Sequence, residues 1–247
     1  MDLEADVTDT TAPAPASKGL PARLLGVLLS PRATYAEIAA RPHWFGALAF
    51  AIGVGALATF VFLSSQVGQQ AMFDQQIKAM ESFGMRITDQ MYTQMESRMA
   101  FAKYTGPIGQ VVAFSLGSLI TAGILLGIFN ALVGGDARFK QVYAIVAHSY
   151  VILTISQIFG LSLGYARESM SGATNLAVFF PFLEETGFVA RFLGSIDLFL
   201  TWWIVSLSIG LAVLYRKRTG PIACTLLGIY VVIALAIALV RTALAGA

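Results

Sequence analysis

Charged side chains are scarce in this sequence. Asp, Glu, Lys and Arg make up 12% of its 247 residues, whereas a soluble domain carries about 25%. Hydrophobic residues reach 57%. A chain with so few charges cannot cover a globule with polar surface, so the composition excludes an ordinary soluble domain and indicates an integral membrane protein.

Cysteine and histidine are almost absent as well. One cysteine excludes a disulfide within the chain, and two histidines, His43 and His148, make a zinc site improbable. The sequence contains no HExxH motif and no P-loop. We therefore expect no catalytic residues and no cofactor.

Clustered basic charge is the third feature that is missing. The formal net charge is +2, and the 16 Lys and Arg residues are spread over the loops rather than along one stripe. Nucleic-acid binding needs such a stripe to follow the phosphates. We therefore expect no nucleic-acid partner.

Two long apolar stretches meet at residues 129–150, FNALVGGDARFKQVYAIVAHSY. The polar link between them is short and contains Gly134, Gly135, Asp136, Arg138 and Lys140. A link of this length between two membrane-length runs predicts an antiparallel helical hairpin, and its basic residues favour the cytoplasmic side.

The whole chain predicts an all-α polytopic membrane bundle with five spans. Each span approaches or exceeds the ~20 apolar residues that cross a bilayer. The predicted spans are about 45–67, 107–133, 141–165, 198–215 and 219–240. Residues 1–19 are expected to be a disordered acidic tail. Residues 20–44 are expected to be two amphipathic helices that lie on the cytoplasmic membrane surface, with packing on the bundle as the alternative.

Residues 71–104 form a predicted amphipathic segment between the first two spans, interrupted at Gly84. With residues 167–197, this segment is expected on the non-cytoplasmic side. Met91, Met95 and Met99 recur at every fourth position, so their thioethers share one helix face. Such a stripe is conceivable as a copper(I) site, but packing is the favoured interpretation.

Basic residues set the orientation. With the N-terminus in the cytoplasm, the two short loops contribute Arg138 and Lys140, and the run 216–218, to the cytoplasmic side. Short loops carry the positive-inside rule. An odd number of spans then places the C-terminus outside. We expect a multi-pass protein of the bacterial inner membrane, with the lipid bilayer and a membrane protein or a second copy as partners.

Few polar groups and several small residues lie within the spans. The polar residues are Asn130, His148, Gln157 and Asp197. Capping of the fourth span is the favoured role of Asp197, and a hydrogen-bonded structural role that of His148. Two GxxxG pairs, Gly123 with Gly127 and Gly160 with Gly164, are expected to hold the hairpin together by close helix packing, with dimerisation as the alternative.

Four stretches together resemble the Yip domain family, the Ypt/Rab-interacting membrane proteins, in its bacterial branch. They are LLSPRATYAEIAARPHW, ALVGGDARFKQVYAIVAHSY, IDLFLTWWIVSLSIGLA and a short basic loop before a final span. The resemblance implies five spans with a cytosolic N-terminus. It also implies Rab binding for eukaryotic relatives, a role that does not transfer to bacteria. The long Met-rich segment departs from the compact form of the family.

Three functions follow from the sequence as hypotheses. The first is a non-enzymatic scaffold or adaptor that acts through protein and membrane-surface contacts. The second is a transporter of a small solute or ion, with Asn130, His148 and Asp197 along a polar path. The third is an assembly subunit of a larger membrane complex.

Overall fold

A computed structural model describes residues 19–131, 134–170, 174–184 and 187–245 of the chain. The predicted tail, residues 1–19, lies outside this part except for Gly19. The described residues are almost entirely helical. Their helices are α1 (Leu20–Leu29), α2 (Pro31–Ala40), α3 (Phe45–Leu63), α4 (Gln66–Ser82), α5 (Asp89–Ala131), α6 (Phe139–Arg167), η1 (Leu176–Phe179), α7 (Phe188–Gly194), α8 (Leu198–Leu214) and α9 (Thr219–Ala245).

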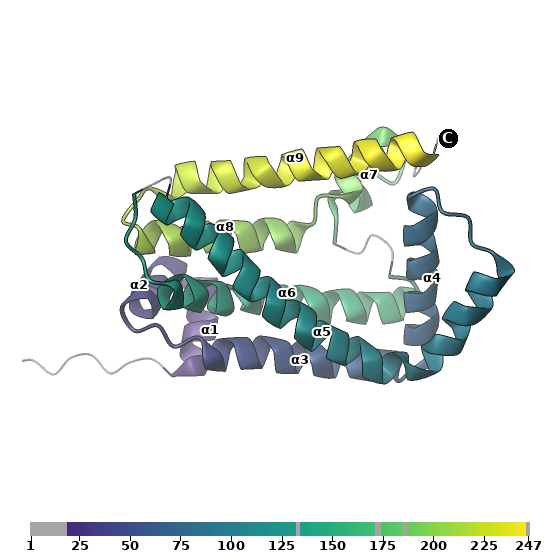
Figure 1. The fold of residues 1–247 in the computed structure, drawn as a ribbon, viewed down its shortest axis with the longest axis horizontal. Coiled ribbons are helices and arrows are strands. Elements are labelled where there is room, and N and C mark those ends of the chain that lie inside the picture. The colour runs from purple at the N-terminus through teal and green to yellow at the C-terminus, as the bar shows by residue number, and fades with distance from the viewer. Residues whose placement is uncertain (1–18, 132–133, 171–173, 185–186, 246–247) are drawn as a thin grey trace, which may run out of the picture.

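The all-α membrane bundle is confirmed, but the count of five spans is not. Among the described residues, four helices are long and apolar enough to cross a membrane, namely α3, α5, α6 and α9. The fourth predicted span is α8, which has only 17 residues. It begins about halfway along the bundle, because the chain after α6 folds back through η1 and α7 beside α9 before α8 starts (Figure 1).

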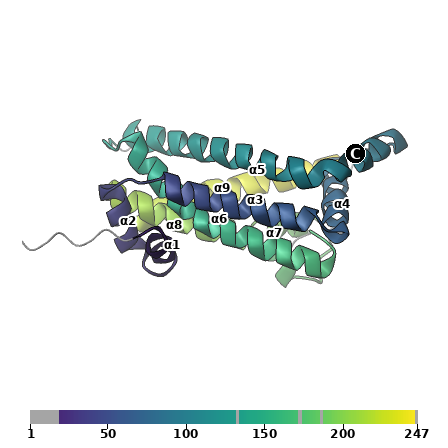
Figure 2. The same cartoon turned by 90° about the horizontal axis from the view of Figure 1, so that it is seen from below.

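The N-terminal half of α6 forms the centre of the bundle. Every residue from Val142 to Ile152 is buried, because α1, α2, α3, α5 and α8 all pack around it. The core therefore lies at the end of the molecule where α1 and α2 sit (Figures 1 and 2). At the other end the helices separate, and their surfaces are more exposed.

Helices α1 and α2 pack against the bundle end. Val27, Tyr35 and Ile38 are buried between these helices and the bundle, and the hydroxyls of Tyr35 and Ser206 in α8 are hydrogen bonded at 2.9 Å. Burial raises the pKa of Tyr35, because the charged phenolate would lose its hydration. Leu25 and Leu29 stay exposed on the opposite side of α1. Packing on the bundle was the less favoured alternative from the sequence, and a position at the membrane surface stays a prediction.

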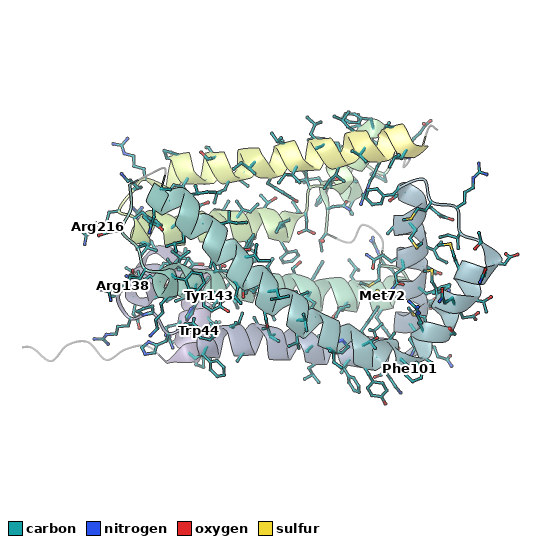
Figure 3. All side chains as sticks on the ribbon, viewed as in Figure 1. Trp44, Met72, Phe101, Arg138, Tyr143 and Arg216 are labelled. Carbon is teal, nitrogen blue, oxygen red and sulfur yellow. The ribbon has the colours of Figure 1, made fainter. Side chains whose placement is uncertain are left out.

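Helix α5 differs from the expected boundary at Gly106-Pro107. The sequence predicts that a separate span starts there, but α5 continues through Pro107 for 43 residues. A helix of this length rises about 65 Å, which exceeds the thickness of a bilayer. The ribbon bends near Phe101, within two turns before the proline, where the missing N–H and the ring weaken the helix (Figure 3).

The first residues of α5 and the whole of α4 cap the end of the bundle opposite α1 and α2 (Figures 1 and 2). Gly84 lies in the turn between them with a φ of 76°, a conformation that favours glycine, so the expected interruption is present. Ser65 caps α4 by accepting a hydrogen bond from the Gly68 amide at 3.0 Å. We call residues 66–104 the α4–α5 cap.

Candidate functional site

Two tight loops meet at the end of the bundle near α2. One joins α5 to α6, and the other joins α8 to α9 (Figure 3, labels Arg138 and Arg216). Asn130 connects them: its amide donates to the carbonyl of Ala137 at 2.9 Å, and its oxygen accepts from the Tyr215 hydroxyl at 3.0 Å. Asn130 therefore holds the loops together.

The tyrosine ring of the second loop closes this junction. Tyr215 stacks on Phe129 with a centroid distance of 4.9 Å. A Cβ atom at Gly135 would lie 2.4 Å from a carbon of the Tyr215 ring, so only glycine fits there. Gly134 has a φ of 69°, which also favours glycine. The two glycines thus let the hairpin loop approach Tyr215.

A polar cavity of about 570 Å³ lies between the loops. Arg138, Arg216 and Lys217 line it, together with one acid, Asp136. All four side chains are exposed. Gly134 and Gly135 line it as well, whereas Lys140 is exposed in the first turn of α6. An excess of cations in a polar hollow suits an anionic group. We call this hollow the basic cavity.

His148 lies in the buried core rather than beside a cavity wall. Its exposed fraction is 0%. Its Nδ1 donates to the carbonyl of Ala144 at 2.8 Å, and Nε2 is buried without a hydrogen-bond partner in the described residues. The nearest residues of its helix are all buried. This environment favours a structural histidine over a proton carrier.

Gln157 is the centre of a polar network that joins three spans. Its amide nitrogen is hydrogen bonded to Thr59 Oγ1 at 2.8 Å and lies 3.2 Å from the Gly55 carbonyl. Its oxygen accepts from Gln110 at 2.8 Å, and Thr59 donates to Gln110 at 2.7 Å. Because each amide finds partners on the other helices, the network links α3, α5 and α6.

Replacing Gln157 with leucine should lower the free energy of unfolding by about 1 kcal/mol. Hydrogen bonds between spans contribute about 0.6 kcal/mol on average and at most about 1.7 kcal/mol, and the Gln110 amide also loses its acceptor. Thermal unfolding of purified protein in detergent measures this loss. The control is Gln75→Leu at an exposed position of α4, which should unfold as the natural chain does. A Gln157→Leu variant of unchanged stability would contradict a structural role for the network.

Asp197 caps α8, as favoured from the sequence. One carboxylate oxygen accepts from the Leu200 amide at 2.8 Å, and the other accepts from the Thr174 hydroxyl. The Asp197 amide donates to the Tyr230 hydroxyl of α9 at 2.7 Å. Asp197 also lines a hollow of about 290 Å³ with Gln157. These contacts explain why α8 starts where it does.

The three residues of the hypothetical polar path are not brought together. Asn130 is bonded to the loops, His148 to its own helix, and Asp197 to the segment before α8 and to α9. Their partners differ in every case. Gln157 does join polar groups across spans, and its network includes none of the three.

The two GxxxG pairs do not form the expected helix contact. A Cβ atom at Gly123, Gly127 or Gly160 would have no neighbour within 4 Å. At Gly164 it would meet Met170, which follows the same helix rather than facing it from α5. Close packing uses Gly55, whose added Cβ would lie 2.4 Å from Gln110. Every predicted span contains at least one glycine, so spacing alone did not identify the contact.

The methionine stripe lies in the α4–α5 cap, where Figure 3 shows sulfur atoms between α4 and the first turns of α5. Met91, Met95 and Met99 are half-buried. Met99 packs with Met72 on a small apolar cluster that includes Phe62. Packing, the favoured interpretation, has direct support at Met99. Within the described residues, no three His, Cys, Asp or Glu side chains form a metal-binding group.

Three tyrosines of this architecture were not anticipated from the sequence. Tyr35, Tyr215 and Tyr230 each join a loop or helix to a distant segment through the hydroxyl. Tyr35 lies on the apolar face of a short helix, and Tyr215 immediately precedes the basic run. Tyrosine is suited to such sites because its ring can be buried while its hydroxyl still finds a partner. That property is the only signal the sequence offered.

A search among curated proteins and a search among solved structures each found no match. A scan of family models matches the Yip1 domain over residues 25–241, nearly the whole chain. The matched range begins in α1, includes both loops of the basic cavity and ends in the last turns of α9. The resemblance to this family expected from the sequence is confirmed. The chain is a membrane protein of the Yip1 domain family.

Proposed function

We propose that this protein is a non-enzymatic scaffold or adaptor of a bacterial inner membrane, and that it binds a protein partner through the α4–α5 cap. The observation that carries the proposal is the shape of α5. Its first turns extend beyond the bundle, past the bend near Phe101 (Figures 2 and 3). A membrane protein needs no such extension merely to cross lipid.

The outer face of the cap combines charge with exposed aromatic residues. Phe101 and Tyr104 are exposed by 65% and 53%. On the side toward α4, Tyr92 packs edge-on against Phe73 and the methionines are half-buried. Glu96 and Arg98 are also exposed, within two turns before Phe101. Aromatic and arginine side chains are enriched in protein interfaces, so the outer face has a suitable composition for a partner.

The orientation that we propose places the basic cavity in the cytoplasm and the cap outside. The described basic residues near α1, α2 and the two loops are Arg23, Arg32, Arg41, Arg138, Lys140, Arg216, Lys217 and Arg218. The cap carries Lys, Arg, Asp and Glu in a mixture instead. Short loops rich in Lys and Arg stay in the cytoplasm, which supports this orientation.

The transporter hypothesis has less support. His148 has no exposed surface, and Asn130, His148 and Asp197 share no contact that could form a path. The hypothesis of an assembly subunit differs from the adaptor only in the identity of the partner. Identification of a cross-linked partner separates the two.

Photo-cross-linking in membranes tests the adaptor. A photoreactive residue is placed at Gln94 or Arg98 on the outer face of the cap, and in control variants at Leu119 or Leu239 on exposed apolar faces of α5 and α9. We expect discrete protein adducts from the cap positions only, because the control positions face lipid. Mass spectrometry identifies the partner, and an adduct of twice the mass of the chain reports a second copy.

A matched variant makes the test specific. Exchanging Glu96→Lys with Arg98→Glu reverses both charges of the outer face without changing the net charge of the chain. We expect it to reduce the Gln94 adducts at least fivefold. Equal adducts from cap and control positions, or adducts that survive the exchange, would show that the cap is not a specific docking surface.

A further inference from the structure

A second hollow continues from the basic cavity into the membrane-spanning part of the bundle. It has a volume of about 450 Å³ and lies between the last turns of α5 and the first turns of α9. Its lining is formed by Ile128, Phe129, Lys217, Arg218, Pro221, Ile222, Thr225, Leu226 and Ile229. Lys217 lines both hollows, so polar and apolar surfaces are continuous. We call the second hollow the apolar groove.

The polar part of this composite site carries excess positive charge. Three cations, Arg138, Arg216 and Lys217, line the basic cavity with one acid, Asp136. A fourth cation, Arg218, lines the apolar groove. The polar groups of Asn130 and Tyr215 are already bonded to each other and to Ala137. The cations are exposed and are suited to charge-assisted hydrogen bonds to a phosphate.

The apolar groove has the dimensions of a lipid chain. Its floor includes Phe129 and Ile222, which are 5% and 9% exposed, and its rim includes Ile128 and Ile229, at 36% and 49%. From its first residue, Thr219, to Ile229, helix α9 rises about 15 Å. One leaflet of the hydrocarbon core is about 15 Å thick, so a single acyl chain could extend along the groove.

The backbone at Arg216 is an independent sign that its side chain is used. Arg216 has a φ of 53°, in the left-handed region. The Lys217 amide donates to the Ala212 carbonyl at 2.9 Å, which closes the helix end in the manner that usually places glycine at position 216. An arginine there is less favourable than glycine for the backbone, so a role for its guanidinium would account for it.

We propose that this composite site binds one anionic phospholipid from the leaflet next to the two loops. The phosphate contacts Arg138, Arg216 and Lys217, and one acyl chain lies in the apolar groove. Charge complementarity selects an anionic headgroup, and the continuity with the groove selects a lipid rather than a free anion. The site lies at the opposite end of the bundle from the α4–α5 cap and does not depend on the adaptor function.

Native mass spectrometry of the purified full chain in detergent tests the proposal. Phosphatidylglycerol and phosphatidylcholine with identical acyl chains are added in separate titrations, and inorganic phosphate is added as a competitor. We expect one phosphatidylglycerol to be retained at least tenfold more tightly than phosphatidylcholine. Millimolar inorganic phosphate should displace it only weakly, because phosphate lacks the chain that fills the groove.

Variants separate the two halves of the site. Each surface cation contributes about fivefold to the binding of an anionic lipid, so Arg216→Gln with Lys217→Gln should weaken retention roughly 25-fold. Thr225→Trp fills the groove without changing a charge and should also abolish selective retention. The control, Arg98→Gln with Lys103→Gln, removes two cations at the opposite end and should retain the lipid as before.

Arg216→Gly distinguishes a binding role from a structural one. Because glycine suits the left-handed backbone, the melting temperature should stay the same or rise while phosphatidylglycerol retention falls about fivefold. Equal retention of the two lipids, or full retention in the Gln pair and in Thr225→Trp, would overturn the proposal. Displacement by phosphate at low concentration, with no effect of Thr225→Trp, would indicate a free-anion site instead.

Discussion

Replacing Tyr35 with alanine is expected to lower the free energy of unfolding by about 3–5 kcal/mol, the usual loss for a buried aromatic ring. Tyr35 has no exposed surface, and its ring lies against Gly210 of α8. The substitution removes this packing and the hydrogen bond to Ser206. The buried side chains of α1 and α2 pack on the bundle around Tyr35. We therefore expect these two helices to detach from the bundle before the spans separate.

Thermal unfolding in detergent measures the loss, and limited proteolysis at the α1–α2 turn detects the detachment. The control is Tyr35→Phe, which keeps the ring and removes only the hydroxyl. It should cost about 1 kcal/mol and leave the turn protected. If Tyr35→Ala and Tyr35→Phe unfolded at the same temperature, the ring would not be the anchor of the N-terminal helices.

Replacing Gly210 with valine is expected to cost about 3 kcal/mol, at the upper end of the range for overpacking. A Cβ atom at Gly210 would lie 2.5 Å from Ile145 Cγ2 and 3.1 Å from the Tyr35 ring. Both neighbours are fully buried, so neither can move away cheaply. The same unfolding measurement applies, and the folded yield of the variant should fall with its melting temperature.

Gly228→Val in α9 is the matched control. It introduces the same side chain into a spanning helix, at a glycine with no neighbour within 4 Å of the added Cβ. We expect less than about 1 kcal/mol of change, since valine has a higher helix propensity than glycine. Equal losses from the two substitutions would mean that glycine is needed for the helices themselves and not for the contact of α2, α6 and α8.

Much of the fold could be predicted because its causes are local. Scarce charge and long apolar runs determine that α3, α5, α6 and α9 can span a membrane. Glycines and polar residues determine the tight link at residues 134–138 and the turn at Gly84. The capping role of Asp197 was also evident, because an acidic residue immediately before an apolar helix can bond to its first amides.

Helix neighbours could not be predicted, because a side chain that faces lipid is as apolar as one that faces another helix. Gly123, Gly127 and Gly160 of the GxxxG pairs have no close neighbour for this reason, while Gly55 and Gly210 make close contacts with other helices. The position at which α8 begins depends on a contact with Tyr230, which lies in another helix. The bend of α5 depends on whether the helix continues through Pro107 or ends before it.

The candidate site shows the same difference between what local sequence predicts and what tertiary contacts decide. The sequence by itself determined that this is a membrane-embedded helical protein with two basic loops, since composition and loop length are properties of the chain alone. Only the tertiary structure decided that these loops, some 80 residues apart, share one cavity that opens onto an apolar groove. The two loops lie together because Tyr215 donates a hydrogen bond to Asn130 and packs closely against Gly135. These contacts join residues far apart in the sequence, so no local sequence pattern predicts them.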